Sequence, residues 1–409
     1  MRIVEDPVEG PLEVKHGLPA VVKFCRNCVI SNQRVGPTES LKDAAGNVEK
    51  PTVRFHDDGL CDACHAVARK GETDWDAREA ELTQLLDRMR SRNGAYDCLV
   101  PGSGGKDSVY AAHMLKTRFG MNPLTVTFAP HIYTDVGWRN FQNWINVGGF
   151  DNYLFTANGH VQRALTRHAY RNLLHPFQPF TIGQRYFPVK MAKRLGISLI
   201  FYGENAAEYG TDGDDTETSL VPLRYNTFDS REEIFLGGVP ISDLQQRGIS
   251  EQMLDPYMPI SGSEVRDAGI EVHYLGYFLP WTPQENYYYA VEHADFEANT
   301  ERTEGTYSKY NSIDDRVDGF HYWTGFVKFG IGRCTHESSQ EVRHGHITRE
   351  EAVALVHRYD GEFPERYFKD FLDYVDMSAE EFHEIADTFR SPHLWRRTNE
   401  GWELRHGVS

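Results

Sequence analysis

The sequence lacks a long hydrophobic run and a signal-like beginning. Among its 409 residues, the longest apolar segment is Ile197 to Tyr202, which Ser198 interrupts. A membrane-spanning helix needs about 20 apolar residues, so none is expected. The first ten residues, MRIVEDPVEG, carry acids where a secretory signal carries bases, and they have no apolar centre. We therefore expect a cytoplasmic protein.

Basic residues are also scarce. Lys and Arg number 43 against 60 Asp and Glu, which gives a formal net charge of −17. Nucleic-acid binding depends on Lys and Arg that replace the counterions of phosphates. The segment from Gly203 to Ser219 holds six acids and no base, which we interpret as a solvated loop that would repel a polyanion. The charge therefore argues against nucleic acid as the main partner.

Only six cysteines are present, and four of them form two Cys-x-x-Cys pairs. In a reducing compartment such pairs bind metal more often than they form disulfides. Two pairs complete a closed tetrahedral site, so we predict a structural Zn²⁺, and an iron–sulfur cluster remains an alternative. The segment from Gly36 to Lys50, between the pairs, is interpreted as an exposed loop. The predicted metal ligands are Cys25, Cys28, Cys61 and Cys64.

The remaining pattern divides the chain into three regions, at roughly 150 residues per domain. We predict a four-cysteine metal-binding module over residues 1–74, an α/β domain over 75–280 and a mostly helical region over 281–409. The predicted strands are Tyr96–Pro101, Leu124–Phe128, Tyr153–Phe155, Ile197–Tyr202 and His273–Phe278. The predicted helices of the same domain are Trp75–Met89, Val109–Phe119 and Gly159–Leu173. Strands separated by helix-length segments indicate a parallel sheet.

Two capping-box patterns predict helix starts in the third region. In each, a Ser or Thr is followed three residues later by Glu, which lets each side chain bond to the other's backbone. The pairs are Thr348 with Glu351 and Ser378 with Glu381.

One glycine-rich segment, PGSGGKDSVY, lies between a predicted strand and a predicted helix. It is neither a Walker P-loop nor a GxGxxG motif. Glycines allow close approach of the backbone, and the helix N-terminus presents N–H groups to an anion. We expect a phosphate site that also uses two hydroxyl groups, a cation and a carboxylate for Mg²⁺. The predicted ATP-binding residues are Ser103, Gly104, Gly105, Lys106, Asp107 and Ser108, of which Lys106 and Asp107 are also the predicted catalytic residues.

The string SGGKDS resembles the PP-loop of the ATP-pyrophosphatase superfamily. Over nearly its whole length the chain also resembles one branch, the N-acetyl sugar amidotransferase family of surface-glycan biosynthesis. The matching segments are CRNCV, FHDDGLCDACH, HPFQPFTIGQR, YGENAAEYG, EGTYSKYNSIDDR, KFGIGR, VRHGHITREE and YDGEFP. The long insert between the cysteine pairs departs from the usual compact spacing. The expected fold is thus a PP-loop parallel sheet with an N-terminal zinc-ribbon-like module and a mostly helical C-terminal region.

The resemblance implies an ATP-dependent reaction on a nucleotide-activated acetamido sugar. The N-acetyl carbonyl oxygen is adenylated, pyrophosphate leaves, and ammonia displaces AMP to give an acetamidino sugar. The implied cofactors are ATP and Mg²⁺, with structural Zn²⁺. The implied partner is a separate glutaminase subunit that supplies ammonia, together with a cyclase-like companion. Both a UDP-linked diacetamido uronic acid and a CMP-linked nonulosonic acid fit as substrates.

Substrate contacts are expected from two sources. Glu204 and Asn205 follow a predicted strand and would face the same crevice as the loop; helix capping and surface exposure are the alternative. The resemblance points to further polar residues, whose alternative role is a salt-bridge network between helices. These are Lys309, Asp314, Asp315, Arg316, Lys328 and Arg333. We interpret His175 and His321 as structural and assign Cys98 and Cys334 no role.

Two other functions compete with this hypothesis. A PP-loop tRNA sulfurtransferase also combines the loop with a cysteine module, but it needs a basic groove that the acidic composition opposes. A non-enzymatic zinc-ribbon scaffold is the third hypothesis, and the intact SGGKDS string argues against it.

Overall fold

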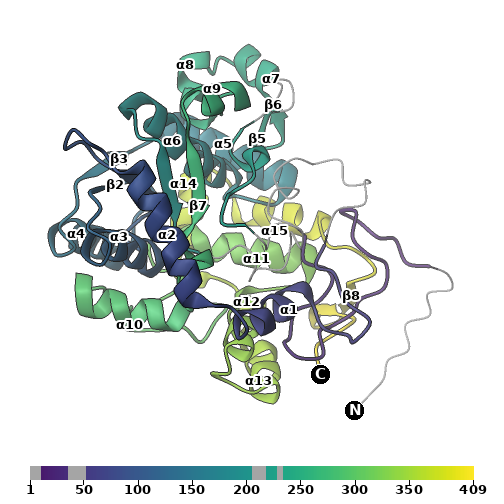
Figure 1. Ribbon diagram of the computed structural model, residues 1–409. Coiled ribbons are helices and arrows are strands. Elements are labelled where there is room, and N and C mark those ends of the chain that lie inside the picture. The colour runs from purple at the N-terminus through teal and green to yellow at the C-terminus, as the bar shows by residue number, and fades with distance from the viewer. Residues whose placement is uncertain (1–10, 36–51, 205–217, 228–233) are drawn as a thin grey trace.

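The computed structural model describes residues 11–35, 52–204, 218–227 and 234–409. At its centre lies a five-stranded parallel sheet with the strand order β3-β2-β1-β4-β7 (Figure 1). The strands are β1 (Cys98–Pro101), β2 (Pro123–Phe128), β3 (Asn152–Phe155), β4 (Leu199–Tyr202) and β7 (Glu271–Tyr274). The chain builds outward from β1 to one edge and then returns to build the other. This order opens a crevice between the carboxyl ends of β1 and β4, which is where α/β proteins bind ligands.

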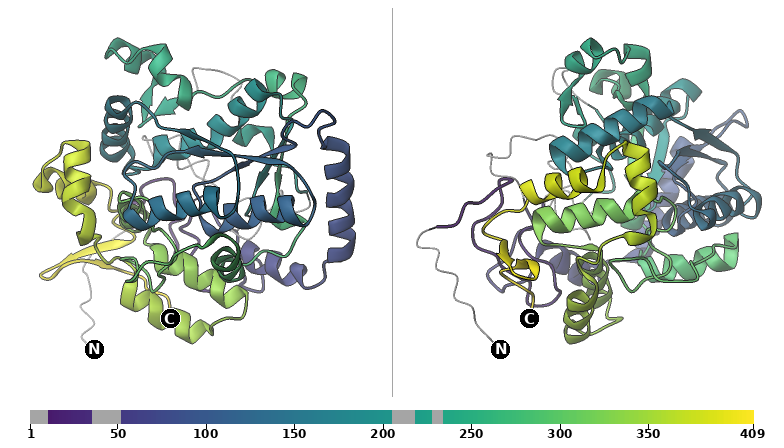
Figure 2. Two further views of the ribbon diagram at one scale, coloured as in Figure 1. Left: turned by 90° about the vertical axis from the view of Figure 1, so that its left-hand side faces the viewer. Right: turned by 180° about the vertical axis from the view of Figure 1, so that it is seen from behind.

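The two faces of the sheet are covered by different helices (Figure 2). Side chains alternate along a strand, so Leu99 packs in one core while Cys98 and Val100 pack in the other. One face is covered by α5 (Gly159–Leu173) and α6 (Gln178–Leu195). The other face is covered by α2 (Trp75–Met89), α3 (Lys106–Thr117), α4 (Asp135–Asn146) and α10 (Pro283–Ala294).

Smaller elements lie between β4 and β7. They are β5 (Phe235–Leu236), β6 (Val239–Pro240), α7 (Ile241–Gln246), α8 (Glu251–Leu254) and α9 (Gly262–Asp267). β5 and β6 pair as an antiparallel hairpin.

The C-terminal region is mostly helical, as predicted. Its elements are α11 (Asp318–Phe329), α12 (Arg333–Arg343), α13 (Arg349–Tyr359), α14 (Phe368–Val375), α15 (Ala379–Thr388), β8 (Trp395–Thr398) and β9 (Gly401–Leu404). Thr348 and Glu351 form the predicted capping box, and the Ser378 side chain accepts from the Glu381 N–H. Phe320, Phe371 and Phe382 join the core that α5 and α6 make on the sheet. An antiparallel hairpin, β8–β9, was not predicted.

The N-terminal module contains one helix, α1 (Asp62–Lys70). Leu18 and Val35 of the preceding segment pack against Leu394 and Trp395 near the end of the chain. Both ends of the described chain therefore lie on the same side of the molecule (Figures 1 and 2). The predicted loop from Gly36 to Lys50 and most of the acidic segment after β4 lie outside the described residues. Among the helices that are described, none is both long and apolar enough to span a membrane.

The structure differs from the sequence prediction at several boundaries. α3 begins at Lys106 rather than Val109, because Gly105 caps it and Asp107 lies in the first turn, near the positive end of the helix dipole. β7 ends at Tyr274, and a 3₁₀ turn replaces its predicted continuation to Phe278. α4 and α6 were missed; α6 is buried on most of its circumference, so it shows no single apolar stripe.

The boundary predicted near residue 280 stays a prediction. α10, which follows it, packs along α3, which precedes it (Figure 1). The apolar cores likewise contain residues from both sides of that position.

Candidate active site at the glycine loop

The glycine loop connects β1 to α3 and depends on glycine at defined positions. Gly104 has a φ of 84°, and a Cβ there would lie 2.8 Å from the Phe141 Cα. Both the backbone conformation and the packing against α4 therefore require glycine. A Cβ on Gly203, at the end of β4, would lie 2.3 Å from the Asp107 carbonyl oxygen. The end of β4 thus lies against the first turn of α3, which the glycine loop begins.

A cavity of about 260 Å³ opens at this point, and we name it the glycine-loop cavity. Its lining includes the loop, the end of β4 and one face of α6. The residues are Pro101, Gly102, Ser103, Gly105, Asp107, Ser108, Val126, Phe128, Gln184, Pro188, Tyr202, Gly203 and Glu204. Four predicted ATP-binding residues therefore line one cavity: Ser103, Gly105, Asp107 and Ser108. Gly104 shapes the turn, and Lys106 lines the neighbouring cavity.

Asp107 is held by three donors. Its Oδ2 lies 2.8 Å from Lys106 Nζ, and its Oδ1 accepts from Trp281 Nε1 at 3.0 Å and Asn286 Nδ2 at 2.8 Å. Hydrogen bonds to a charged group contribute about 1.5–3 kcal/mol each, so the carboxylate is fixed in direction. Sequence reasoning missed Trp281, which precedes α10, and Asn286, which lies in it, because both are far from the loop along the chain and no local pattern links them to it.

Glu204 lies across the glycine-loop cavity from the loop. Burial raises the pKa of its carboxyl group to about 7, and the nearby Asp107 carboxylate adds to the shift. Two carboxylates on one cavity repel each other, and a divalent cation relieves that repulsion. Glu204 and Asp107 therefore fit a Mg²⁺ ion that accompanies bound phosphates. Asn205 lies outside the described residues.

A second cavity, of about 330 Å³, shares Asp107 with the first and is also lined by Lys106, and we name it the basic cavity. Five cations line it: Arg34, Lys106, Lys328, Arg333 and Arg343. Its acids are Asp107 and Glu337. The excess of positive charge suits an anionic ligand, and the planar arginine groups suit phosphate or carboxylate oxygens.

Two of the predicted substrate residues, Lys328 and Arg333, line the basic cavity. Lys328 is buried and donates to the Leu173 carbonyl at 2.7 Å. Arg333 pairs with Glu337 one turn along α12 and stacks over Tyr322, with its guanidinium carbon 4.2 Å from the ring centre. Both cations are therefore fixed by the fold.

Three histidines also line this cavity: His175, His321 and His336. Burial lowers the pKa of His321 to about 3, with Arg333 adding to the effect, and burial likewise lowers the pKa of His175. Their rings stack with centroids 4.9 Å apart. Neutral stacked rings agree with the structural role expected for His175 and His321. The Nδ1 of His175 nonetheless has no hydrogen-bond partner among the described residues.

The other predicted substrate residues lie outside the described lining of both cavities. Lys309 is exposed and donates to the Thr300 carbonyl at 3.0 Å. Arg316 pairs with Asp370 on α14 at 3.0 Å. The Arg316 pair matches the alternative of a salt-bridge network, whereas the Lys309 contact is with a backbone carbonyl. Substrate binding by either residue stays a prediction.

Asp314 and Asp315 connect the loop before α11 to other parts of the site. Asp315 is buried and accepts from His131 Nδ1 at 2.8 Å and from the His131 N–H at 2.7 Å. Burial raises the pKa of Asp314, whose side chain is hydrogen-bonded to Ser103 of the glycine loop. Asp314 therefore stabilises the glycine loop through Ser103. Direct contact of Asp314 or Asp315 with substrate stays a prediction.

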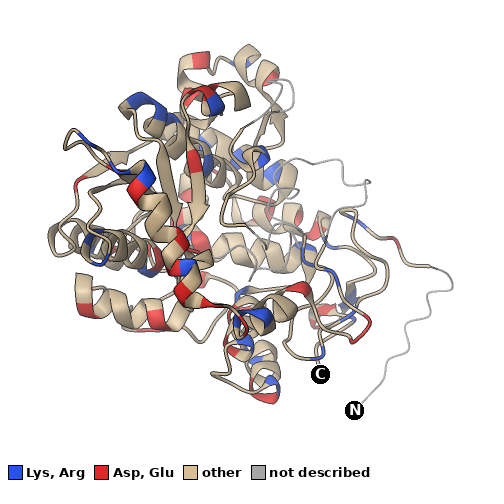
Figure 3. Ribbon diagram, in the orientation of Figure 1, with Lys and Arg blue, Asp and Glu red and all other residues tan. Residues whose placement is uncertain are grey.

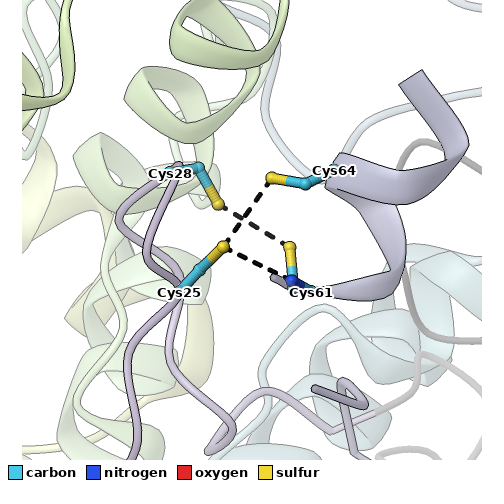
Figure 4. Close-up of side chains that lie close together, drawn as sticks. All are labelled: Cys25, Cys28, Cys61 and Cys64. Atoms are coloured by element: carbon cyan, nitrogen blue, oxygen red, sulfur yellow. Dashed lines mark hydrogen bonds between the residues drawn. The ribbon is translucent and has the colours of Figure 1, made fainter. Parts of the chain in front are cut away.

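The four predicted metal ligands converge in one buried cluster (Figure 4). Their Sγ atoms all lie within 4.8 Å of one another, and two pairs, Cys25–Cys64 and Cys28–Cys61, are 3.7 Å apart. A tetrahedron with Zn–S bonds of about 2.3 Å has edges of about 3.8 Å. An iron–sulfur cluster binds its thiolates to different irons and spreads them more widely. The geometry therefore fits a single tetrahedral ion such as Zn²⁺.

The fold and the site together define an α/β protein with a glycine loop after β1 and a four-cysteine module. Residues 304–408 match the family described as "LPS biosynthesis protein WbpG-like, C-terminal domain". That part of the chain is therefore similar to a domain of lipopolysaccharide biosynthesis, in agreement with the resemblance to a surface-glycan family.

Two further likenesses are weaker. The uncharacterized protein MJ1599 of Methanocaldococcus jannaschii is 31% identical over 77 residues, which are 19% of this chain and 27% of that protein. The NMN synthetase of Francisella tularensis is similar over 48% of this chain and 93% of its own, with 11% identity and a TM-score of 0.21. The fold is therefore assigned from the strand order and the glycine loop described above, and not from this likeness.

Proposed function

We propose that this chain is an ATP-dependent amidotransferase that converts the N-acetyl group of a nucleotide-activated sugar into an acetamidino group. The observation that carries the proposal is the junction of the two cavities at Asp107, beside Lys106 of the basic cavity. One cavity has the features of a phosphate site, and the other is lined by cations. A reaction that joins a nucleotide phosphate to a group on an anionic acceptor needs such an arrangement.

In the proposed reaction, ATP occupies the glycine-loop cavity. The N–H groups at the start of α3 and the hydroxyls of Ser103 and Ser108 would bind its phosphates. Mg²⁺, held by Asp107 and Glu204, would supply positive charge to the departing pyrophosphate. Lys106, fixed against Asp107 at 2.8 Å, adds a further cation at the junction. Positioning and charge neutralisation are the main terms in such chemistry.

The acceptor sugar occupies the basic cavity. Its N-acetyl oxygen attacks the α-phosphorus, forming a P–O bond while the bond to pyrophosphate breaks. Ammonia then adds to the imidate carbon, and the C–O bond breaks to release AMP, which keeps the former carbonyl oxygen. The lipopolysaccharide-biosynthesis description of the matching domain supports a sugar acceptor, and Lys328 and Arg333 support an anionic one.

The ammonia source is proposed to be a separate glutaminase subunit, with a cyclase-like companion that conducts ammonia. Cys98 and Cys334 are the two cysteines outside the four-cysteine cluster, and both are fully buried. A glutaminase nucleophile must reach its substrate, so neither residue suits that role.

The proposal is tested by ATP turnover with Mg²⁺, ammonium chloride and a panel of UDP- and CMP-linked acetamido sugars, with bulk tRNA as a separate arm. We expect sugar-dependent release of AMP and pyrophosphate and a product roughly one mass unit lighter, since NH replaces O. Turnover with tRNA alone would instead support the sulfurtransferase. Lys and Arg are interspersed with Asp and Glu in the view of Figure 3, whereas tRNA binding relies on concentrated positive charge.

A further inference from the structure

The four-cysteine module contributes directly to the basic cavity. Arg34, six residues after Cys28, lines the cavity together with residues of α11 and α12. Its charge acts on His336 and Tyr322, which line the same cavity. Ile331, another lining residue, packs in the small apolar cluster that contains the four cysteines. The module therefore forms part of the cavity wall.

Arg343 links the metal ligands to the same cavity. It lies at the end of α12, lines the basic cavity, and donates from Nη1 to Cys28 Sγ at 3.7 Å. A divalent ion with four thiolates has a net charge of −2, which attracts a guanidinium and orients it. Loss of the ion removes the group that holds the four thiolates together, and with them the Sγ of Cys28 that Arg343 contacts.

Apart from its contacts with the C-terminal region, the module has few internal interactions that hold its shape. The described residues around the cysteines are connected by isolated bridges, Phe24 with Ser31 and Phe55 with Cys61, rather than by a sheet. Their apolar cluster is small compared with the two cores on the central sheet. In modules of this kind the free energy of metal binding supplies much of the folding free energy. Arg34 follows this cluster directly, and the packing of the next residue, Val35, against Leu394 and Trp395 adds to its support. The metal therefore contributes to the position of Arg34.

We propose that Arg34 and Arg343 bind the anionic acceptor in the basic cavity, and that the metal of the four-cysteine module holds both arginines in position. This inference rests on the proposed function, because it takes the occupant of the basic cavity to be an anionic nucleotide sugar. The module thereby sets acceptor affinity, while the glycine-loop cavity, lined by the sheet and α6, binds ATP independently of Arg34 and Arg343.

Equilibrium binding tests the proposal without turnover. The probes are the tightest-binding member of a panel of UDP- and CMP-linked acetamido sugars and, separately, a non-hydrolysable ATP analogue with Mg²⁺. The variants are Arg34→Gln, Arg343→Gln and their combination. Arg349→Gln is the matched control, because Arg349 donates to the Cys25 carbonyl at 3.4 Å but is not among the residues that line the cavity. Metal content is measured for every protein.

We expect each arginine substitution to raise the Kd for the sugar probe by about tenfold, while the ATP-analogue Kd stays within about twofold. All variants should keep one metal ion per chain. Removing the metal from the wild-type protein should weaken sugar binding at least as much as the double substitution. Metal removal from the double variant should weaken it little further, because the same two contacts are already lost.

Three results would count against the proposal. Unchanged sugar binding in both arginine variants would overturn it and leave the proposed function intact. Fully additive effects of metal removal and the double substitution would show that the metal does not act through these arginines. Failure of the wild-type protein to bind any sugar nucleotide would overturn the proposed function itself, and this inference with it.

Discussion

The glycine-loop cavity and the basic cavity share Asp107 but are built in different ways. The first is formed mainly by two short segments, the turn after β1 and the end of β4, with additional residues from β2 and α6. The second collects side chains from segments spread between Arg34 and Arg343, including the cysteine module, α10, α11 and α12. One cavity depends on backbone geometry at a few positions, and the other depends on long side chains that tertiary packing brings together.

This difference explains which residues could be found from the sequence. A glycine loop between a strand and a helix is a contiguous signal, so the loop residues could be chosen as a group. Four of them line one cavity, and ATP binding by them stays a prediction. Arg34, Arg343 and Trp281 have no neighbours in sequence that reveal their role. The same comparison yields four predictions, in descending order of expected effect.

Lys106→Ala tests whether the reaction takes place where the two cavities meet, beside Lys106. We expect AMP formation to fall by about 10²–10³-fold, because a fixed cation is lost where charge develops. Lys369→Ala is the control, since Lys369 is exposed and pairs with Asp373 on the surface. Steady-state AMP release measures both. Turnover near the wild-type level in Lys106→Ala would separate the two cavities functionally and contradict the proposed mechanism.

Gly104→Ala tests the dependence of the glycine-loop cavity on backbone geometry. The new Cβ would lie 2.8 Å from the Phe141 Cα, at a φ of 84° that residues other than glycine rarely adopt. We therefore expect the substitution to lower the free energy of unfolding by about 3 kcal/mol. Gly105→Ala is matched, because Gly105 has a φ of −70° and its Cβ would have no neighbour closer than 3.8 Å. Chemical denaturation compares the two variants. Equal losses of stability in the two variants would show that the backbone conformation at Gly104 does not require glycine.

Arg333→Met tests the assignment of the acceptor to the basic cavity. We expect the KM for the sugar nucleotide to rise by about tenfold while the KM for ATP changes little. Removing Arg333 also leaves the buried Glu337 without its cationic partner, so stability should fall as well. The double variant Arg333→Met with Glu337→Gln should recover stability but not acceptor KM. A rise confined to the KM for ATP would indicate that Arg333 binds ATP, and it would contradict the assignment of the acceptor to the basic cavity.

The pH dependence tests the pairing of Glu204 with Asp107. Because the pKa of Glu204 is raised to about 7, the group becomes ionised as pH rises through that value. Its charged fraction is about one tenth at pH 6 and nine tenths at pH 8. Apparent Mg²⁺ affinity should therefore rise over this interval, and Glu204→Gln should flatten the profile. An unchanged profile in that variant would assign the titration to another group.

Much of the fold followed from local sequence signals. The alternation of strands and helices predicted the parallel sheet, and α5 was predicted from Gly159 to Leu173 as observed. α6 escaped prediction because burial on most sides removes the periodic contrast between apolar and polar residues. The β8–β9 hairpin escaped because Arg396 and Arg397 break the apolar alternation of a typical strand.

The candidate site was predicted unevenly for a related reason. Cys25, Cys28, Cys61 and Cys64 were found because paired spacing is itself a signal, and the structure brings them together. Lys328 and Arg333 were chosen through family resemblance and do line the basic cavity, whereas Lys309 and Arg316 do not line either cavity in the described chain. Spacing along a chain does not reveal which side of a helix faces a cavity formed by distant segments.

An isotope-transfer experiment tests the central claim most directly. The acceptor nucleotide sugar is prepared with ¹⁸O in its N-acetyl carbonyl and incubated with the enzyme, ATP, Mg²⁺ and ammonium, and AMP is analysed by mass spectrometry. If the carbonyl oxygen attacks the α-phosphorus where the two cavities meet, each AMP formed acquires one ¹⁸O. AMP without the label, formed together with the amidine product, would contradict adenylation of the acceptor and the account of the site given above.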